Sequence, residues 1–298
     1  MPPQPWPTLG EDPFDFFFST VFHDDLRTTF SHVLCREWMH KEGMDSQLLD
    51  AARATRRDLP GLKRAAALIR ASRDVKFDHN ANKFRIGGKV ASGLLRRLEK
   101  TTGWTQTNPR SRSYAETKRR ASHDKKLDRS CSTWGEVHGS RVHGEVAEAC
   151  RAISRLRNLR PGIRKRDPCT ERILKFLHAR KWIPVAPELP VGARGLATAV
   201  DLVAVDARTG DMLALEFKTG YEGEEYGVKA GDKHLPMGMR DCPRDRHELQ
   251  LAATCLLMPV QPDRAYIVKP CSRARGIEWF EITWWKNRRK ELESLMYP

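Results

Sequence analysis

Three apolar segments of strand length in the C-terminal half of the sequence constrain its fold more than any other feature. They are WIPVAPEL (182–189), TAVDLVAVD (198–206) and MLALEFKT (212–219). Such runs, rich in Val, Ile and aromatic residues and bounded by turn residues, are typical of β-strands. The second and third are joined by the five residues 207–211, which include Gly210, where a hairpin turn requires a positive φ. The sequence therefore predicts a hairpin within a sheet.

Segments with helical spacing flank these strands. Apolar residues of GSRVHGEVAEACRAISRLRNL (139–159) form one stripe, so we expect a helix that begins after Gly139 and Ser140. Further helices are expected over 169–182 and 246–258. They are followed by strands over 264–269 and 277–282 and a closing helix over 284–296. The alternation predicts an α/β fold.

The N-terminal part has a different texture. Apolar residues at helical spacing predict helices between about 21 and 72, and KFRIGGKV (83–90) predicts a short hairpin around Gly87 and Gly88. Residues 104–133 are rich in Ser, Thr, Arg and Lys, as is typical of a linker or a nucleic-acid-contacting loop. We therefore divide the chain into a mainly helical region (1–103), a basic linker or DNA-contacting loop (104–133) and a C-terminal domain (134–298).

The net charge of +15 is concentrated in one stretch of the chain. Residues 51–130 hold 22 of the 53 Lys and Arg residues but 7 of the 38 acidic residues, which leaves 31 of each elsewhere. A basic block of this size favours binding to a polyanion, because each phosphate that is neutralised releases a counterion. The alternative is a basic surface that is merely solvated.

Cysteine spacing and hydropathy limit the class of protein. The seven cysteines are widely spaced and form no CxxC pair, which argues against a disulfide framework, a zinc ribbon and an iron–sulfur cluster. No run of eighteen apolar residues is present, and the first residues are acidic where a targeting peptide is basic. We expect a soluble intracellular protein without membrane contact. Nucleus, mitochondrion and viral replication site are not distinguished.

A candidate site lies at the ends of the hairpin strands. Strand alternation puts Glu216 and Lys218 on one face, and pairing about the five-residue turn sets residue 206 beside 212 and Asp201 near 217. Two carboxylates in otherwise apolar strands cost several kcal/mol unless a cation compensates them. A sparse carboxylate pair suits Mg²⁺ or Mn²⁺, with Lys218 beside the attacking water or the phosphate. The competing interpretation is a surface Glu216–Lys218 ion pair and a turn-capping Asp201.

These residues, in this order, resemble the PD-(D/E)xK nuclease superfamily, and within it the RecB-like exonuclease branch. The similarity covers roughly residues 135–285. It depends on Gly139-x-x-x-His143, on Asp201, on Glu216-Phe217-Lys218 and on Gln250 in the later helix. Thr254 stands where that branch often has a Tyr.

The resemblance implies a fold, an activity and a set of roles. The implied fold is a mixed central β-sheet flanked by helices, with a restriction-endonuclease-like core. The implied activity is Mg²⁺- or Mn²⁺-dependent hydrolysis of phosphodiester bonds in DNA, by exonuclease or endonuclease attack, in DNA replication, repair or recombination. Asp201, Glu216, Lys218 and Gln250 are the implied catalytic residues. The implied metal site comprises Asp201, Glu216, Phe217 and His143, with Glu145 or Glu148 as substitutes for His143.

Several alternatives stay open at this point. His143 alone is also consistent with a histidine packed against the sheet. The whole chain is consistent with a non-catalytic DNA-binding or packaging protein that retains a nuclease-like fold. Exonuclease or endonuclease action, DNA or RNA as substrate, strand preference and oligomeric state, including a ring, are not decided by the sequence.

Overall fold

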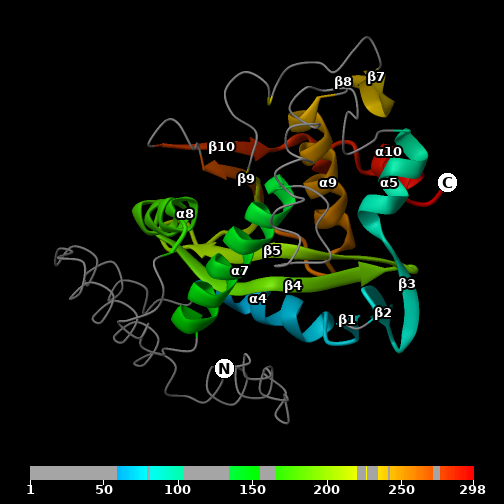
Figure 1. Ribbon diagram of the computed structural model, residues 1–298. Coiled ribbons are helices and arrows are strands. Elements are labelled where there is room, and N and C mark those ends of the chain that lie inside the picture. Colours follow the sequence, from blue (N-terminus) through cyan, green and yellow to red (C-terminus); the bar gives the residue numbers. More distant parts are fainter. Residues whose placement is uncertain are drawn as a thin grey trace, which may run out of the picture.

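The computed structural model describes residues 59–78, 81–103, 134–154, 166–219, 226, 234–240, 242–270 and 276–298 (Figure 1). The helices predicted between 21 and 58 and the linker predicted over 104–133 lie outside these residues. Within the described ranges, no helix combines the length and the apolar character needed to cross a bilayer.

An eight-stranded mixed sheet forms the centre of the fold, as predicted for an α/β protein. Seven strands follow the order β1-β2-β3-β5-β6-β9-β10, and β4 pairs with β5. Pairing is parallel between β3 and β5 and between β6 and β9, and antiparallel elsewhere in this sheet. The strands are β1 (Val75–Asp78), β2 (Lys83–Ile86), β3 (Lys89–Gly93), β4 (Trp182–Ala193), β5 (Leu196–Asp206), β6 (Met212–Phe217), β9 (Arg264–Pro270) and β10 (Ile277–Ile282).

Helices cover both faces of this sheet (Figure 1). One face packs against α4 (Pro60–Ala71), α5 (Leu94–Thr102), α9 (Pro243–Leu257) and α10 (Arg289–Met296). The other face packs against α7 (Trp134–Ser154) and α8 (Pro168–Ala179). A small hairpin of β7 (His234–Leu235), the 3₁₀ turn η2 (Pro236–Gly238) and β8 (Met239–Arg240) precedes α9, and η3 (Trp284–Lys286) precedes α10. The two apolar cores lie on opposite sides of the same strands, so the central strands are buried on both faces.

The described N-terminal residues belong to this same sheet. Ser92 and Gly93 of β3 pair with Leu196 and Ala197 at the start of β5. In addition, the backbone N–H of Gly61 in α4 donates to the carbonyl of Gly210 in the hairpin turn at 2.8 Å. That approach leaves no room for a Cβ at Gly61. Parts of the chain on both sides of the predicted boundary at residue 103 therefore pack as one unit.

The predicted strands and most predicted helices are confirmed, with two differences in the helices. α7 begins at Trp134, so Gly139 and Ser140 lie inside it rather than before it. The predicted closing helix is divided into η3 and α10, because Arg288, with φ −112° and ψ 27°, leaves the helical path. The hairpin around Gly87 and Gly88 forms as β2 and β3, with positive φ at both glycines.

Candidate active site

Three carboxylates lie in one row across β4, β5 and β6. On one side of β5, the pairs Leu189↔Val200 and Pro187↔Leu202 set Glu188 beside Asp201. On the other side, the pair Leu202↔Leu215 sets Glu216 at the next register position, opposite Asp201. Neighbouring strands are ~4.8 Å apart, so the register places three acidic residues side by side.

This register differs by one residue from the prediction. We expected residue 206 beside 212 and Asp201 near 217, whereas Val205 pairs with Met212. Asp206 N–H donates to the Asp211 carbonyl, so these two residues extend the ladder and the turn consists of residues 207–210 instead of the predicted 207–211. Within the turn, Gly210 N–H donates to the Asp206 carbonyl. Gly210 has φ 78°, and the Asp206 carboxylate also accepts from the N–H of Arg208. The correction moves Asp201 directly opposite Glu216.

Asp201 lies where the neighbours of β5 separate. β3 pairs with residues 196–197 of β5, and β6 pairs with residues 202–205. Among the described residues, residues 198–201 pair only with β4. We call residues 198–201 the sheet opening. Thr198 and Ala199 are partly exposed there, the Asp201 side chain is 11% exposed and Val200 is buried.

His143 reaches the same place from α7. A Cβ at Gly139 would lie 3.1 Å from the Thr219 hydroxyl oxygen, just past the end of β6, so glycine allows the helix to approach closely here. One turn later, His143 Nε2 lies 3.0 Å from the carbonyl oxygen of Phe217. The Gly-x-x-x-His spacing thus has a structural reason, because the two residues lie on the same face of the helix one turn apart.

Lys218 and Gln250 both contact Glu216. Lys218 Nζ lies 2.6 Å from Glu216 Oε1, and the Gln250 side-chain amide donates to the same oxygen at 2.8 Å. Lys218 Nζ also donates to Gln250 Oε1 at 3.3 Å. Glu216 is almost fully buried, with its side chain 3% exposed. The three groups form a closed triangle in which both partners of Glu216 also bind each other.

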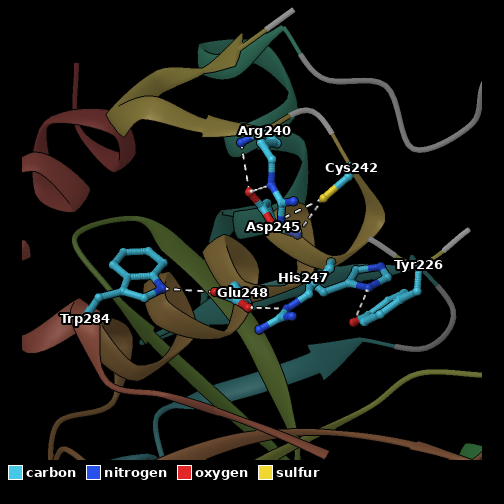
Figure 2. Close-up of polar contacts among 8 residues, drawn as sticks. Tyr226, Arg240, Cys242, Asp245, His247, Glu248 and Trp284 are labelled. Carbon is cyan, nitrogen blue, oxygen red and sulfur yellow. Dashed lines mark hydrogen bonds and ion pairs between the residues drawn. The ribbon is translucent and has the colours of Figure 1, made fainter. Parts of the chain in front are cut away.

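The start of α9, which positions Gln250, is fixed by polar contacts (Figure 2). Cys242 Sγ accepts from the Asp245 N–H at the helix start, and the Asp245 carboxylate binds Arg240. Further along, Glu248 accepts from Trp284 Nε1, while the Tyr226 hydroxyl lies 3.1 Å from His247 Nδ1. These contacts tie α9 to the segments before and after it and so fix the direction of Gln250.

The acidic row raises carboxyl pKa values. Burial raises the pKa of Glu216, and the Asp201 charge raises it further against the opposing effect of Lys218. Burial also raises the pKa of Glu188 to about 7, and Asp201 again adds to the shift. Both shifts express the cost of holding neighbouring negative charges away from water.

Most of the predicted site residues come together around the end of β6. They are Asp201, Glu216, Lys218, His143 and Gln250, with the backbone of Phe217. Phe217 N–H donates to Asp201 Oδ2 at 2.7 Å, so the backbone of β6 orients that carboxylate.

Glu145 does not join this group. Its Oε2 atom accepts from Asp167 N–H and from the Thr170 hydroxyl, both at 2.8 Å, at the start of α8. It connects the two helices on that face of the sheet instead of facing the carboxylates. Glu148 is exposed on α7. The structure therefore gives no support to either glutamate as a substitute for His143.

A second cluster of possible ligand atoms, His138, Asp167 and Cys169, has a structural explanation. Asp167 is the N-cap of α8 and accepts from Cys169 N–H at 2.9 Å. The other carboxylate oxygen contacts His138 and the Arg141 guanidinium. A carboxylate that already binds an arginine and caps a helix is accounted for by packing of α7 against α8.

Glu188 was missed by the sequence analysis. It is an acidic residue in an otherwise apolar strand, which is the same signal that identified Asp201 and Glu216. Its place beside Asp201 depends on the β4–β5 register and on a left-handed backbone conformation with φ 51°. Neither of these can be obtained from residue spacing.

Two comparisons with known proteins found no match. No protein-family model matches the sequence, and the search of curated proteins found no match. Functional inference therefore depends on the site itself.

Proposed function

We propose that this chain is a metal-dependent nuclease that hydrolyses phosphodiester bonds in DNA. The observation that carries the proposal is the convergence of Asp201, Glu216 and Lys218 at the end of β6, with His143 approaching from α7. This set and its order along the chain resemble the PD-(D/E)xK nucleases. We also propose the finer description of the fold, a restriction-endonuclease-like core of the RecB-like branch, on the same resemblance.

A divalent cation fits the donor set around Asp201. His143 Nδ1, Asp201 and Glu188 offer ligand atoms that all lie within 4.8 Å of one another. Carboxylate oxygens suit Mg²⁺ or Mn²⁺, and imidazole is a further ligand that Mn²⁺ accepts. The candidate ligands from the sequence are Asp201, Glu216, the Phe217 backbone and His143. The chemistry that such a cation supplies when bound is polarisation of a phosphoryl oxygen and a lower pKa for the attacking water.

Lys218 and Gln250 supply the other polar groups of this mechanism. The Lys218 ammonium is 18% exposed and held by Glu216, so it presents positive charge to the sheet opening without being free to move away. Charge of this kind stabilises the negative charge that develops on phosphate during the reaction. Gln250, which binds both Glu216 and Lys218, keeps the carboxylate and the ammonium in one geometry. It is therefore a positioning residue in this proposal.

DNA binding is proposed for the basic N-terminal half. In the described part, exposed lysines occur on β1, β2 and β3, and β3 joins β5 beside the sheet opening. Sliding of one strand along these cations toward Asp201 is consistent with exonuclease action. The alternative function, DNA binding or packaging without cleavage, differs from the proposal in leaving Lys218 and the carboxylates without a chemical role.

A digestion assay distinguishes the two functions. Full-length wild type, Glu216→Gln and Lys218→Met are incubated with end-labelled single- and double-stranded DNA in Mg²⁺, Mn²⁺ or EDTA. Exposed Arg289→Gln on α10 is the control substitution. We expect cleavage by wild type and the control with metal, and a loss of at least ~100-fold in the two site variants. Binding of DNA without cleavage by wild type supports the alternative function, and equal cleavage by all four proteins contradicts the site.

A further inference from the structure

The hydrogen bond between His143 and Phe217 fixes the tautomer of the imidazole. A backbone carbonyl only accepts, so His143 Nε2, at 3.0 Å from the Phe217 oxygen, must carry the hydrogen. In the neutral ring, Nδ1 is then an acceptor with its lone pair directed away from β6. Histidines that bind metals are commonly oriented in this way, by a hydrogen bond from the second ring nitrogen.

Nδ1 faces two carboxylate oxygens. It lies 3.6 Å from Asp201 Oδ1 and 3.9 Å from Glu188 Oε1, beyond ordinary hydrogen-bond distance in both cases. Three acceptors that converge at this spacing repel one another unless a positive charge lies among them. Ligand distances of ~2.1 Å put two donors on one octahedral ion ~3.0 Å apart when adjacent and ~4.2 Å apart when opposite. Both measured separations lie between these limits, so shifts of well under ~1 Å would bring the donors onto one cation.

Glu188 reaches this position through its backbone conformation. With φ 51° it interrupts the regular β4–β5 pairing, which resumes on both sides at Pro187↔Leu202 and Leu189↔Val200. A residue other than Gly, Asn or Asp adopts this region at a cost of ~1 kcal/mol or more. The side chain is 36% exposed and so remains reachable from solvent.

One carboxylate oxygen of Glu216, by contrast, already has two partners. This Oε1 atom contacts the Lys218 ammonium at 2.6 Å and accepts from the Gln250 amide at 2.8 Å. The Phe217 carbonyl is likewise engaged by His143, and Asp201 Oδ2 accepts from Phe217 N–H. Around Asp201, the potential ligand atoms that lie within 4.8 Å of one another among the described residues are those of His143, Asp201 and Glu188.

We propose that Glu188, together with His143 and Asp201, holds the divalent cation of this site, while Glu216 serves mainly to fix Lys218 and Gln250. This inference rests on the proposed metal-dependent function. It shifts the cation from the β5–β6 hairpin to the β4–β5 side of the row and names a ligand that the motif does not contain. The cation class is one that accepts two carboxylates and one imidazole, which Mn²⁺ does.

Metal binding in the absence of DNA tests this assignment. Full-length metal-free protein is titrated with Mn²⁺, and free Mn²⁺ is followed by electron paramagnetic resonance. The variants are Glu188→Gln and Glu216→Gln, which remove one negative charge each from either side of Asp201, so Glu216→Gln is a control matched in charge. Glu293→Gln on α10, with a side chain 35% exposed, is the control matched in exposure. Thermal unfolding in EDTA verifies that each variant is folded.

We expect Glu188→Gln to weaken Mn²⁺ binding at least ~10-fold more than Glu216→Gln, with Glu293→Gln unchanged. Nitrogen hyperfine coupling to bound Mn²⁺ should be present in wild type and lost in His143→Asn. Equal weakening in the two charge-matched variants, or a larger loss in Glu216→Gln, overturns the inference. DNA cleavage that persists with such a result leaves the proposed nuclease standing. Tight Mn²⁺ binding through Glu188 without any cleavage contradicts the nuclease and supports the ligand set, and absence of Mn²⁺ binding by wild type overturns both.

Discussion

Gly139 and Thr219 touch across the junction of α7 and β6: a Cβ at Gly139 would lie 3.1 Å from the Thr219 hydroxyl oxygen. This close approach sets the height of α7 above the sheet and so sets the distance from His143 to Phe217, one turn further on. The absence of a side chain at Gly139 thus allows α7 to pack closely against the end of β6.

Gly139→Ala should therefore disturb the site, whereas Gly144→Ala on the same helix should not. A Cβ at Gly144 meets nothing within 4 Å, so alanine there gains ~0.5–1 kcal/mol of helix stability. At Gly139 the same gain is offset by displacement of Thr219 or of α7. We expect lower Mn²⁺ affinity and lower DNA cleavage in Gly139→Ala, measured beside Gly144→Ala. The double variant Gly139→Ala/Thr219→Ala should recover both, and a failure to recover would show that the contact is not the cause.

Gln250→Met should destabilise the protein through Glu216. The change keeps the length of the side chain but removes the donor to Glu216 and the acceptor for Lys218, two largely buried charged groups. Loss of a buried partner of this kind costs ~1–3 kcal/mol. Urea unfolding measures the cost. In a Glu216→Gln background the effect should be much smaller, and an undiminished effect there would contradict coupling between the two side chains.

Stability in the absence of metal should depend on pH through Glu188. Its pKa rises from the usual 4.5 to about 7 in the folded protein, so the fold favours the neutral carboxyl. The contribution to stability is then fully present below pH 4.5 and is lost as the pH rises to about 7. Thermal unfolding in EDTA between pH 4.5 and 8 should show wild type losing stability relative to Glu188→Gln as the pH rises. Parallel curves for the two proteins would exclude this contribution.

Basic residues on the β2–β3 hairpin should contribute to DNA binding. Lys83 and Lys89 are exposed there, on the side of the sheet opening where β3 joins β5. If each neutralises one phosphate, Lys83→Gln/Lys89→Gln should reduce the slope of log K against log salt by ~1.8. Fluorescence anisotropy with labelled DNA in Ca²⁺ measures this slope. The control pair is Lys175→Gln/Lys290→Gln, exposed on α8 and α10, and an equal change in both pairs would indicate only nonspecific charge.

The sequence predicted the helices and strands of this fold better than the register in which the strands pair. Alternating strand segments and glycine turns identified β5, β6 and the β2–β3 hairpin, because these signals are local. The register between β5 and β6 was wrong by one residue, because a turn closed by Asp206 and Gly210 uses one residue fewer than the spacing suggested. Local signals fix which residues form a strand, whereas tertiary contacts such as that of Gly61 with the hairpin turn help to fix the register.

The same distinction applies to the candidate site. Asp201 and Glu216 were predicted from charge within apolar strands, and Lys218 from its position two residues after Glu216. His143 was predicted from the resemblance, whose Gly-x-x-x-His spacing matches Gly139 and His143. Glu145 has the helical spacing of a site residue but binds the start of α8, since Asp167 N–H and Thr170 lie nearer to it than the carboxylate row. Glu188 required knowledge of a strand-to-strand alignment that no motif encodes.

The left-handed backbone at Glu188 has a consequence for how this chain can be stabilised. Glycine at that position would relieve the φ of 51° and remove a carboxyl from the acidic row, so Glu188→Gly is expected to raise the melting temperature of the metal-free protein. It would also delete the third ligand of the proposed cation. A screen that selects for thermostability alone would therefore favour loss of this residue. A screen that also requires activity would retain Glu188, and that difference would mark the position as one where activity and stability are in competition.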